Sequence, residues 1–259
     1  MQRELMSDLT TMAILAYEGP DAVVTGAGVL GLRNIIHIER AGTVVVVGSD
    51  ERNLVVAFRG TDDTKDVLYD AEFSTEFGAL GTRVHSGFRR ALDAVWDELR
   101  PTILSSDKKV FLTGHSLGGA LAVLTAARLL SLGRQVDGVV TLGQPRVGKA
   151  AFSRQMNFRL QSRIFRVINY VDPVPRVPLV IQGFRHPGRR WYFDRSGTLT
   201  EDASAARVLW DEWAFRIRRL RSTRALGLAW HAKGAYLELL DWPTVEAPQP
   251  TGIDMDVNP

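Results

Sequence analysis

The stretch Gly114-His115-Ser116-Leu117-Gly118 decides the fold of this chain. It follows the apolar β-type run Val110–Thr113 and precedes a long helix-forming run that begins at Gly119. A serine in a sharp strand-to-helix turn stands above the edge of a sheet, and small neighbours let other backbone pass close by. A serine hydroxyl is a poor nucleophile near neutral pH unless a base and an oxyanion site lie beside it. The pattern therefore predicts a catalytic nucleophile at Ser116, rather than a merely tight turn.

Length and composition favour one large α/β domain over two small ones. The chain has 259 residues, of which 45% are hydrophobic, and this suffices for a sizeable core. We expect a single domain over residues 1–242. Residues 243–259 contain four prolines and are expected to form a C-terminal tail that is loose or draped on the surface.

Cysteine is absent from the sequence. This excludes disulfides, thiol catalysis and thiolate metal sites, and we expect neither a metal nor a cofactor. No apolar run reaches the roughly 18 residues that a membrane span needs, so no transmembrane segment is expected. The first eight residues mix acidic side chains into what would be the apolar region of a signal peptide. These features slightly favour a cytoplasmic location, whereas a secreted location follows if a signal peptide has been removed.

Charge is distributed unevenly along the chain. Residues 176–225 hold 11 arginines and 5 acidic residues, a local net charge of +6, and the remainder carries −3. The segment has no nucleic-acid-binding motif, so no nucleic-acid partner is expected. A solvated helix face is one interpretation of it, and contact with an anionic lipid surface is the other.

Helix-forming and β-type runs alternate along the chain, which predicts a mostly parallel sheet covered by helices. The expected helices cover Arg3–Glu18, Gly87–Leu104, Gly119–Leu132, Ala203–Arg224 and Ala229–Leu240. The expected strands cover Ile35–Glu39, Thr43–Gly48, Asn53–Phe58, Val110–Thr113, Gly138–Leu142 and Arg163–Asn169.

The segment Gly26–Gly31 matches the G-x-G-x-x-G fingerprint of dinucleotide-binding proteins. That fingerprint requires a helix that opens at its third glycine, so that the helix N-terminus faces the pyrophosphate. Here the residues that follow alternate as a strand, with Ile36 and Ile38 on one face. We therefore interpret the segment as a glycine-rich turn.

A serine nucleophile of this architecture is followed along the chain by an acid and then by a histidine. Two histidines follow Ser116. His231 stands at a loop-to-helix junction that suits a base, and His186 lies in a turn and could equally be structural. Asp172 ends a β-type run, at the sheet edge where Ser116 must also lie. Its rival Asp137 precedes a strand and should lie at the opposite edge. Alternatively, Asp172 only initiates an Asp-Pro turn.

The oxyanion hole needs two backbone N–H groups that point at the tetrahedral intermediate. The elbow supplies the N–H of Leu117, and the loop after an upstream strand supplies the other. The run Val55–Thr61 fits this loop, because Gly60 allows a close approach and the hydroxyl of Thr61 is an additional donor.

Taken together, the motifs resemble the class 3 lipases, the fungal-lipase-like branch of the α/β-hydrolases. The similarity covers roughly residues 53–240 in the order of the family, and a weaker sixth segment runs from His231 to Leu237. The five segments that carry it are Phe58–Thr61, Val84–Phe88, Gly114–Ala122, Gly143–Gly148 and Asn169–Pro175.

The resemblance implies an α/β-hydrolase fold and ester hydrolysis by Ser116, His231 and Asp172, with Thr61 and Leu117 at the oxyanion hole. It also implies that His186 belongs to a non-catalytic turn. A triacylglycerol lipase that acts on an ester or acylglycerol substrate is the function expected first. A short-chain or feruloyl-type esterase on the same scaffold is the alternative, and a catalytically dead hydrolase used as a binding module is a remote one.

Two features depart from the family pattern. The lid segment that follows Thr61 lacks the tryptophan that the family often carries there, and the disulfides of fungal members cannot form. Both departures suggest a bacterial member and make a preference for lipid less certain than ester hydrolysis itself. If Asp63–Ala71 is helical, its acids Asp63 and Asp66 share one face, and the apolar face comprises Val67, Leu68 and Ala71 with Thr64. Such a lid could cover Ser116 in water, although an ordinary surface helix is the alternative.

A second amphipathic stretch lies in the arginine-rich segment. Its apolar positions are Leu209, Trp210, Trp213, Ile217 and Leu220, with arginines crowded around them. Packing against the core is the expected role of this stripe. Transient contact with a lipid interface is the alternative, because its basic rim would suit an anionic surface.

Overall fold

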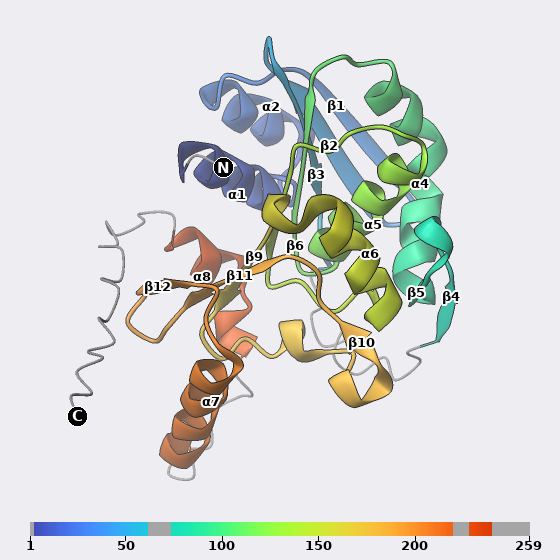
Figure 1. The fold of residues 1–259 in the computed structure, drawn as a ribbon. Helices are drawn as coiled ribbons and strands as arrows, with labels where there is room; N and C mark the ends of the chain where they lie inside the picture. The colour runs from blue at the N-terminus through green and yellow to red at the C-terminus, as the bar shows by residue number, and fades with distance from the viewer. Residues whose placement is uncertain (1–2, 62–73, 220–227, 240–259) are drawn as a thin grey trace, which may run out of the picture.

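The computed structural model describes residues 3–61, 74–219 and 228–239, and its centre is an eight-stranded sheet (Figure 1). The order of strands across the sheet is β1-β2-β3-β6-β7-β9-β11-β12. The five strands β3, β6, β7, β9 and β11 are parallel to one another. At the two edges, the pairs β1·β2, β2·β3 and β11·β12 are antiparallel. The bounds are β1 Arg33–Arg40, β2 Thr43–Ser49, β3 Asn53–Phe58, β6 Lys109–His115, β7 Gly138–Leu142, β9 Ile164–Asn169, β11 Arg189–Phe193 and β12 Leu199–Glu201. The predicted mostly parallel sheet is therefore confirmed.

Helices cover both faces of this sheet (Figure 1). In β2 every residue is buried, and successive side chains enter opposite cores: Val45 and Val47 pack on one side, and Val46 packs on the other. The first side holds α4 (Ser86–Leu104), α5 (Leu117–Ser131) and α6 (Ala150–Leu160), and the second holds α1 (Arg3–Leu15), α2 (Pro20–Val29) and α8 (Lys233–Leu237). Burial on both faces explains why the central strands are continuously apolar rather than alternating.

Smaller elements complete the described structure. A second sheet has the order β10-β8-β5-β4, with β4 Thr75–Phe77, β5 Arg83–His85, β8 Gly148–Lys149 and β10 Phe184–Arg185. The 3-10 turns are η1 Ala79–Gly81, η2 Gln161–Arg163, η3 Val174–Arg176, η4 Val180–Gln182 and η5 Leu228–Trp230.

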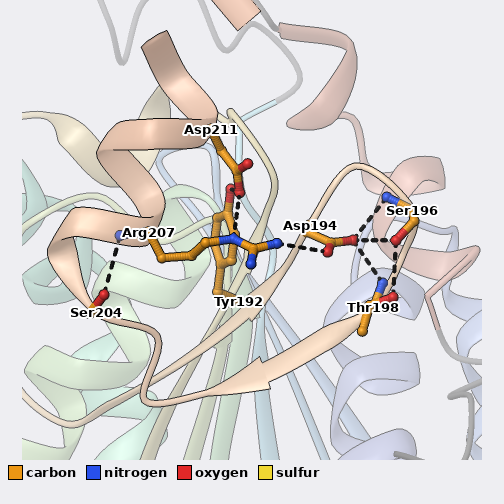
Figure 2. A network of polar contacts seen from close by, with 7 residues as sticks. All are labelled: Tyr192, Asp194, Ser196, Thr198, Ser204, Arg207 and Asp211. Atoms are coloured by element: carbon orange, nitrogen blue, oxygen red, sulfur yellow. Dashed lines mark hydrogen bonds and ion pairs between the residues drawn. The ribbon is translucent and has the colours of Figure 1, made fainter. Parts of the chain in front are cut away.

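Helix α7 (Ala205–Arg219) is attached to the hairpin of β11 and β12 by its polar face (Figure 2). Asp211 accepts from the hydroxyl of Tyr192 at 2.9 Å, and Arg207 pairs with Asp194 at 3.1 Å. Asp194 in turn holds the turn of the hairpin by accepting the backbone N–H groups of Ser196 and Thr198. The first turns of α7 are thus held on the hairpin of β11 and β12 by a hydrogen bond and an ion pair.

The apolar stripe of α7 is exposed to solvent at three of its positions. The sequence analysis expected it to pack against the core, and this expectation was wrong, because Leu209, Trp210 and Trp213 are 61%, 62% and 54% exposed. The inward positions are taken by Val208 and Phe215, which pack on the cluster around Tyr170 and Tyr192. Periodicity alone could not reveal this, because it identifies an apolar face but not what covers it.

The glycine-rich segment Gly26–Gly31 is also corrected in part. It was expected to be a turn, but Gly26 and Gly28 lie inside α2, and only Gly31, with φ 75°, lies in the turn. The next element is strand β1 and no helix opens at Gly31, so the dinucleotide fingerprint lacks its required context.

Several sequence predictions fall outside the described residues. These are the lid, with Asp63, Asp66, Val67, Leu68 and Ala71, and the C-terminal tail 243–259. In the part of the chain that the structure describes, no helix combines the length and the apolar character needed to cross a bilayer.

Candidate active site

Ser116 occupies the sharp turn between β6 and α5. Its backbone has φ 55° and ψ −125°, a region that non-glycine residues rarely adopt. The conformation is held because the N–H of Ser116 donates to the carbonyl of Leu142, on the neighbouring strand β7, at 2.8 Å. Such strain persists only where the surroundings enforce it, and it is typical of a nucleophile elbow.

The two glycines of the G-x-S-x-G motif are required by close backbone contacts. A methyl group on Gly114 would collide with the backbone of Gly118, and one on Gly118 would collide with the carbonyl of Phe58 at the end of β3. Any larger residue at either position would push the helix away from the sheet. The sequence prediction that small residues let backbone pass close to Ser116 therefore describes the packing correctly.

The loop after β3 reaches the same place. A Cβ atom on Gly60 would lie 2.6 Å from the carbonyl oxygen of His115 and 3.2 Å from the Cβ of Ser116. The next residue, Thr61, has a buried hydroxyl oxygen with no hydrogen-bond partner within the described residues. Leu117 is the first residue of α5, where backbone N–H groups have no acceptor inside the helix. The backbone of the loop at Gly60 therefore lies against the turn that carries Ser116.

Asp172 follows β9 and is buried, with 1% of its surface exposed. Its Oδ2 accepts from Nδ1 of His231 at 2.8 Å and from the hydroxyl of Tyr236 at 2.6 Å. Its Oδ1 accepts the backbone N–H of Val174 at 2.9 Å. Three donors thus satisfy a carboxylate that would otherwise be costly to bury.

His231 lies between η5 and α8 and is completely buried. In the neutral form of the ring, donation of the Nδ1 proton to Asp172 places the lone pair on Nε2. Neither Nε2 of His231 nor Oγ of Ser116 has a hydrogen-bond partner among the described residues. The ring of His231 lies 4.6 Å, centroid to centroid, from the ring of His115, which directly precedes Ser116.

Two supporting residues were missed by the sequence analysis, His115 and Tyr236. His115 Nε2 donates to the carbonyl of His231 at 2.8 Å, and Nδ1 accepts from the hydroxyl of Tyr17, the two atoms lying 2.7 Å apart. Burial, followed by the proximity of His231, holds the pKa of His115 well below its ordinary value, so the ring is neutral. His115 therefore fixes the backbone of His231 without adding charge. In the sequence, only the position of His115 next to Ser116 indicated that it could belong to the site.

Tyr236 supports the carboxylate. Burial and the neighbouring Asp172 raise the pKa of Tyr236 well above its ordinary value, so its hydroxyl stays protonated and donates. The sequence places Tyr236 five residues after His231, but nothing in that spacing indicates that it reaches Asp172.

The rival residues lie elsewhere. His186 donates through Nε2 to the carbonyl of Pro175, 2.7 Å away, and makes no hydrogen bond to Asp172. Burial, with Arg166 and Arg146 nearby, holds the pKa of His186 well below its ordinary value. Asp137 precedes β7 and accepts the N–H of Val110 at the amino-terminal end of β6, whereas Ser116 lies beyond its carboxyl end.

Comparison with known proteins agrees with this geometry. A model of the family "Lipase (class 3)" matches residues 55–182. A secreted mono- and diacylglycerol lipase of Fusarium solani is 30% identical over 198 residues, which are 74% of this chain and 57% of that protein. A lipase of Rhizomucor miehei is 35% identical over 170 residues, which are 59% of this chain and 45% of that protein. The chain thus spans about half the length of these curated relatives.

Solved structures show the same fold. The Rhizomucor miehei lipase in complex with its propeptide superimposes with a TM-score of 0.66 at 28% identity, covering 76% of this chain and 70% of that one. A triacylglycerol lipase described as having a serine protease triad as its catalytic centre gives the same score and identity, over 76% of this chain and 82% of that one. From its motifs, its fold and these similarities, the chain belongs to the class 3 lipase family of α/β-hydrolases.

Proposed function

We propose that the protein is a carboxylic ester hydrolase of the acylglycerol lipase type. The observation that carries the proposal is the buried hydrogen bond from His231 to Asp172, which leaves Nε2 of His231 without a partner beside the elbow of Ser116. An oriented histidine next to a strained serine is the arrangement of serine hydrolases. The relatives named as lipases support acylglycerols as the substrate class.

In the first half of the reaction, Oγ of Ser116 attacks the ester carbonyl while Nε2 of His231 takes the hydroxyl proton. The carbonyl oxygen becomes an oxyanion, and the N–H of Leu117 and the hydroxyl and N–H of Thr61 stabilise it. The intermediate then collapses: the ester C–O bond breaks, the leaving alcohol takes the proton from His231, and an acyl-serine remains.

In the second half, water attacks the acyl-serine while His231 accepts a proton from it. Collapse of the second intermediate releases the carboxylic acid and returns the proton to Oγ of Ser116. Asp172 stays ionised throughout, because its role is to orient His231 and to stabilise the imidazolium that forms twice per turnover.

Contact with a lipid interface is a second part of the proposal. Leu209, Trp210 and Trp213 are exposed on α7, whereas Arg207 and Asp211 of the same helix bind the hairpin of β11 and β12. Leu179, which precedes η4, and Ile181, which lies within it, are 46% and 89% exposed. The segment 176–225 adds a net charge of +6. Tryptophan with surrounding arginine suits the headgroup layer of an anionic lipid surface.

A secreted location fits the relatives better than a cytoplasmic one. The Fusarium solani relative is named a secreted lipase, so the preference for the cytoplasm expected from the sequence has no support in the comparisons. We propose that the protein acts outside the cell, where acylglycerol interfaces would be its substrate.

The nucleophile is tested by labelling and substitution. A serine-directed phosphonate should label Ser116 alone, and Ser116→Ala should fold normally with nearly all hydrolysis of p-nitrophenyl esters lost. Ser131→Ala, at the exposed end of α5, is the matched control and should keep full activity. Labelling at another residue, or an active Ser116→Ala variant, would overturn the proposal. A rate profile across acyl lengths then separates a lipase from a short-chain esterase.

A further inference from the structure

A cavity of about 290 Å³ lies between the end of β9, the turns η3 and η4, and helix α7. Four arginines line its wall, together with Glu212: these are Arg146, Arg166, Arg176 and Arg190. Asp172 also borders the cavity, but its carboxylate is engaged by His231 and Tyr236 on the active-site side.

The positive charge in this cavity is not balanced by the acids that face it. Glu212 pairs with Arg176 at 3.1 Å. Within the described residues, Arg146, Arg166 and Arg190 form no ion pair with any carboxylate. The wall also contains Tyr170 and His186, and burial holds the pKa of His186 well below its ordinary value, so its ring is neutral. Glu212 and Asp202 raise the pKa values of Arg146 and Arg166 through space, but less than burial lowers them. Among the described residues, three guanidinium groups therefore share the cavity without a directly paired carboxylate.

The three arginines are held in place by backbone carbonyls rather than by acids. Arg146 donates to Pro178 at 2.8 Å, and Arg190 donates to Ala203 at 2.8 Å. Arg166 uses Nε to donate to Pro187 at 2.8 Å. A guanidinium group has five N–H donors, and each of these hydrogen bonds uses only one of them. The side chains are thus positioned, and donors remain for a ligand.

The lowered pKa values of two of these arginines show that their charged forms are destabilised in the cavity. Burial, followed by the charges of Arg190 and Arg146, lowers the pKa of Arg166 to about 9. Burial, followed by Arg185 and Arg190, lowers the pKa of Arg146 to about 10. A buried charge without a counter-charge is expensive to a fold, so an anion that enters the cavity removes a standing cost.

The mouth of the cavity is apolar. Val180 and Leu209 belong to its lining and are 43% and 61% exposed, so they stand where the cavity meets solvent. Leu209 belongs to the apolar face of α7, and Val180 lies between the exposed Leu179 and Ile181. An anionic group could therefore enter between side chains that are themselves suited to a lipid layer.

We propose that Arg146, Arg166 and Arg190 form a binding site for a phosphate group. Guanidinium forks bind phosphate oxygens in pairs of charge-assisted hydrogen bonds, and several convergent forks suit a tetrahedral oxyanion. The phosphate has two chemical sources, a free phosphate ion or the headgroup of an anionic phospholipid at the apolar mouth. The site is separate from ester hydrolysis and does not depend on the proposed triad.

The first test measures thermal stability against inorganic phosphate, with sodium chloride at matched ionic strength as reference. Phosphate should raise the Tm of the protein along a saturable curve, beyond the effect of chloride. Arg190→Gln should weaken the apparent Kd at least tenfold, and Arg190→Lys should retain part of the response. Arg159→Gln, which removes an exposed arginine of α6, should bind phosphate as the unmodified protein does.

The same variants give a second readout that requires no ligand. In phosphate-free buffer of low salt, Arg190→Gln removes one of three repelling charges, so its Tm should equal or exceed that of the unmodified protein. Saturating phosphate should reverse this order. The proposal is wrong if phosphate acts only as chloride does, or if Arg190→Gln responds to phosphate like Arg159→Gln.

Vesicles distinguish the two sources of phosphate. Ether-linked phosphatidylcholine cannot be hydrolysed by an esterase, and it is prepared with and without ether-linked phosphatidic acid. Binding that requires phosphatidic acid, fails in Arg190→Gln and is displaced by inorganic phosphate assigns the headgroup to the cavity. Saturable binding of free phosphate without any dependence on phosphatidic acid assigns the free ion. If neither probe distinguishes Arg190→Gln from Arg159→Gln, the cavity does not bind phosphate.

Discussion

His231 and His186 share burial but differ in what their ring nitrogens contact. Nδ1 of His231 donates to the carboxylate of Asp172, and its Nε2 has no hydrogen-bond partner among the described residues, whereas Nε2 of His186 donates to the carbonyl of Pro175. Both histidines are buried, so solvent exposure does not distinguish them. The proposed base, His231, differs from His186 in its hydrogen bond to a carboxylate and in its position near Ser116.

We expect His231→Ala to lower kcat for a p-nitrophenyl ester by at least about 100- to 10,000-fold, because the proton of Ser116 then has no acceptor. His186→Ala should leave kcat within a few-fold and lower the Tm, since it removes a buried packing residue. Steady-state kinetics and thermal melts of both variants measure this. The assignment of the base fails if the two losses are exchanged.

In the proposed mechanism Thr61 contributes to the oxyanion hole in two ways, through its backbone N–H and through its hydroxyl. Thr61→Val keeps the shape and the N–H but removes the hydroxyl, so we expect a partial loss of kcat with little change in KM. Complete loss of a donor costs about 100- to 1000-fold in kcat, which is an upper bound here. Thr61→Ser should retain most of the activity. Equal rates for the Val and Ser variants would show that the hydroxyl is not used.

Sequence reasoning could propose Ser116, Asp172 and His231 because each stands at a recognisable junction between elements, and the structure places Ser116 in a strained turn and joins Asp172 to His231. Tyr236 and His115 were beyond its reach, since their roles depend on which side chain meets which after the chain has folded. Tyr236 lies 64 residues from the carboxylate that it supports, and no local pattern encodes a contact of that range.

Among the elements, α7 differs most from its expected placement. The elbow of β6 and α5 was predictable, because an apolar strand, a G-x-S-x-G turn and a helix-forming run are all local signals. The apolar stripe on α7 is also a local sequence pattern. The pattern does not show, however, which face of the helix packs against the rest of the protein. The hairpin of β11 and β12 binds the polar positions Arg207 and Asp211, and this turns the tryptophans toward solvent.

The exposed face of α7 predicts a difference between dissolved and dispersed substrate. Replacing Trp210 and Trp213 by Gln should lower the rate on an emulsified short triglyceride several-fold and leave the rate on a dissolved monomeric ester unchanged. Phe158→Gln, which removes an 87% exposed side chain of α6, is the matched control. The rate is followed through the solubility limit of the triglyceride. An equal decrease on both forms of substrate would exclude an interfacial role.

The whole molecule should lose stability in weak acid. Burial holds the pKa values of His115 and His186 well below 6.5, so the folded state excludes protons that the unfolded chain binds. Their stabilising contribution is therefore complete above pH 6.5 and decreases as the pH falls below it, by up to about 1.4 kcal/mol per pH unit for each histidine.

Urea unfolding between pH 7.5 and pH 5 measures this dependence. The free energy of unfolding should fall with decreasing pH, and His186→Gln should show a smaller slope by the equivalent of one proton. A variant with the same slope as the unmodified protein would show that His186 does not contribute.

The contact of Tyr17 with His115, and of His115 with His231, joins three distant parts of the chain around one nucleophile. On the proposed assignment, a ribosome that has synthesised the chain up to residue 227 has already made the serine, its acid and the oxyanion donors, whereas the general base His231 has still to be made. Hydrolytic competence then requires that residues 228–239 be synthesised and close against α1. A nascent chain stalled before residue 228 should therefore be unable to cleave an ester.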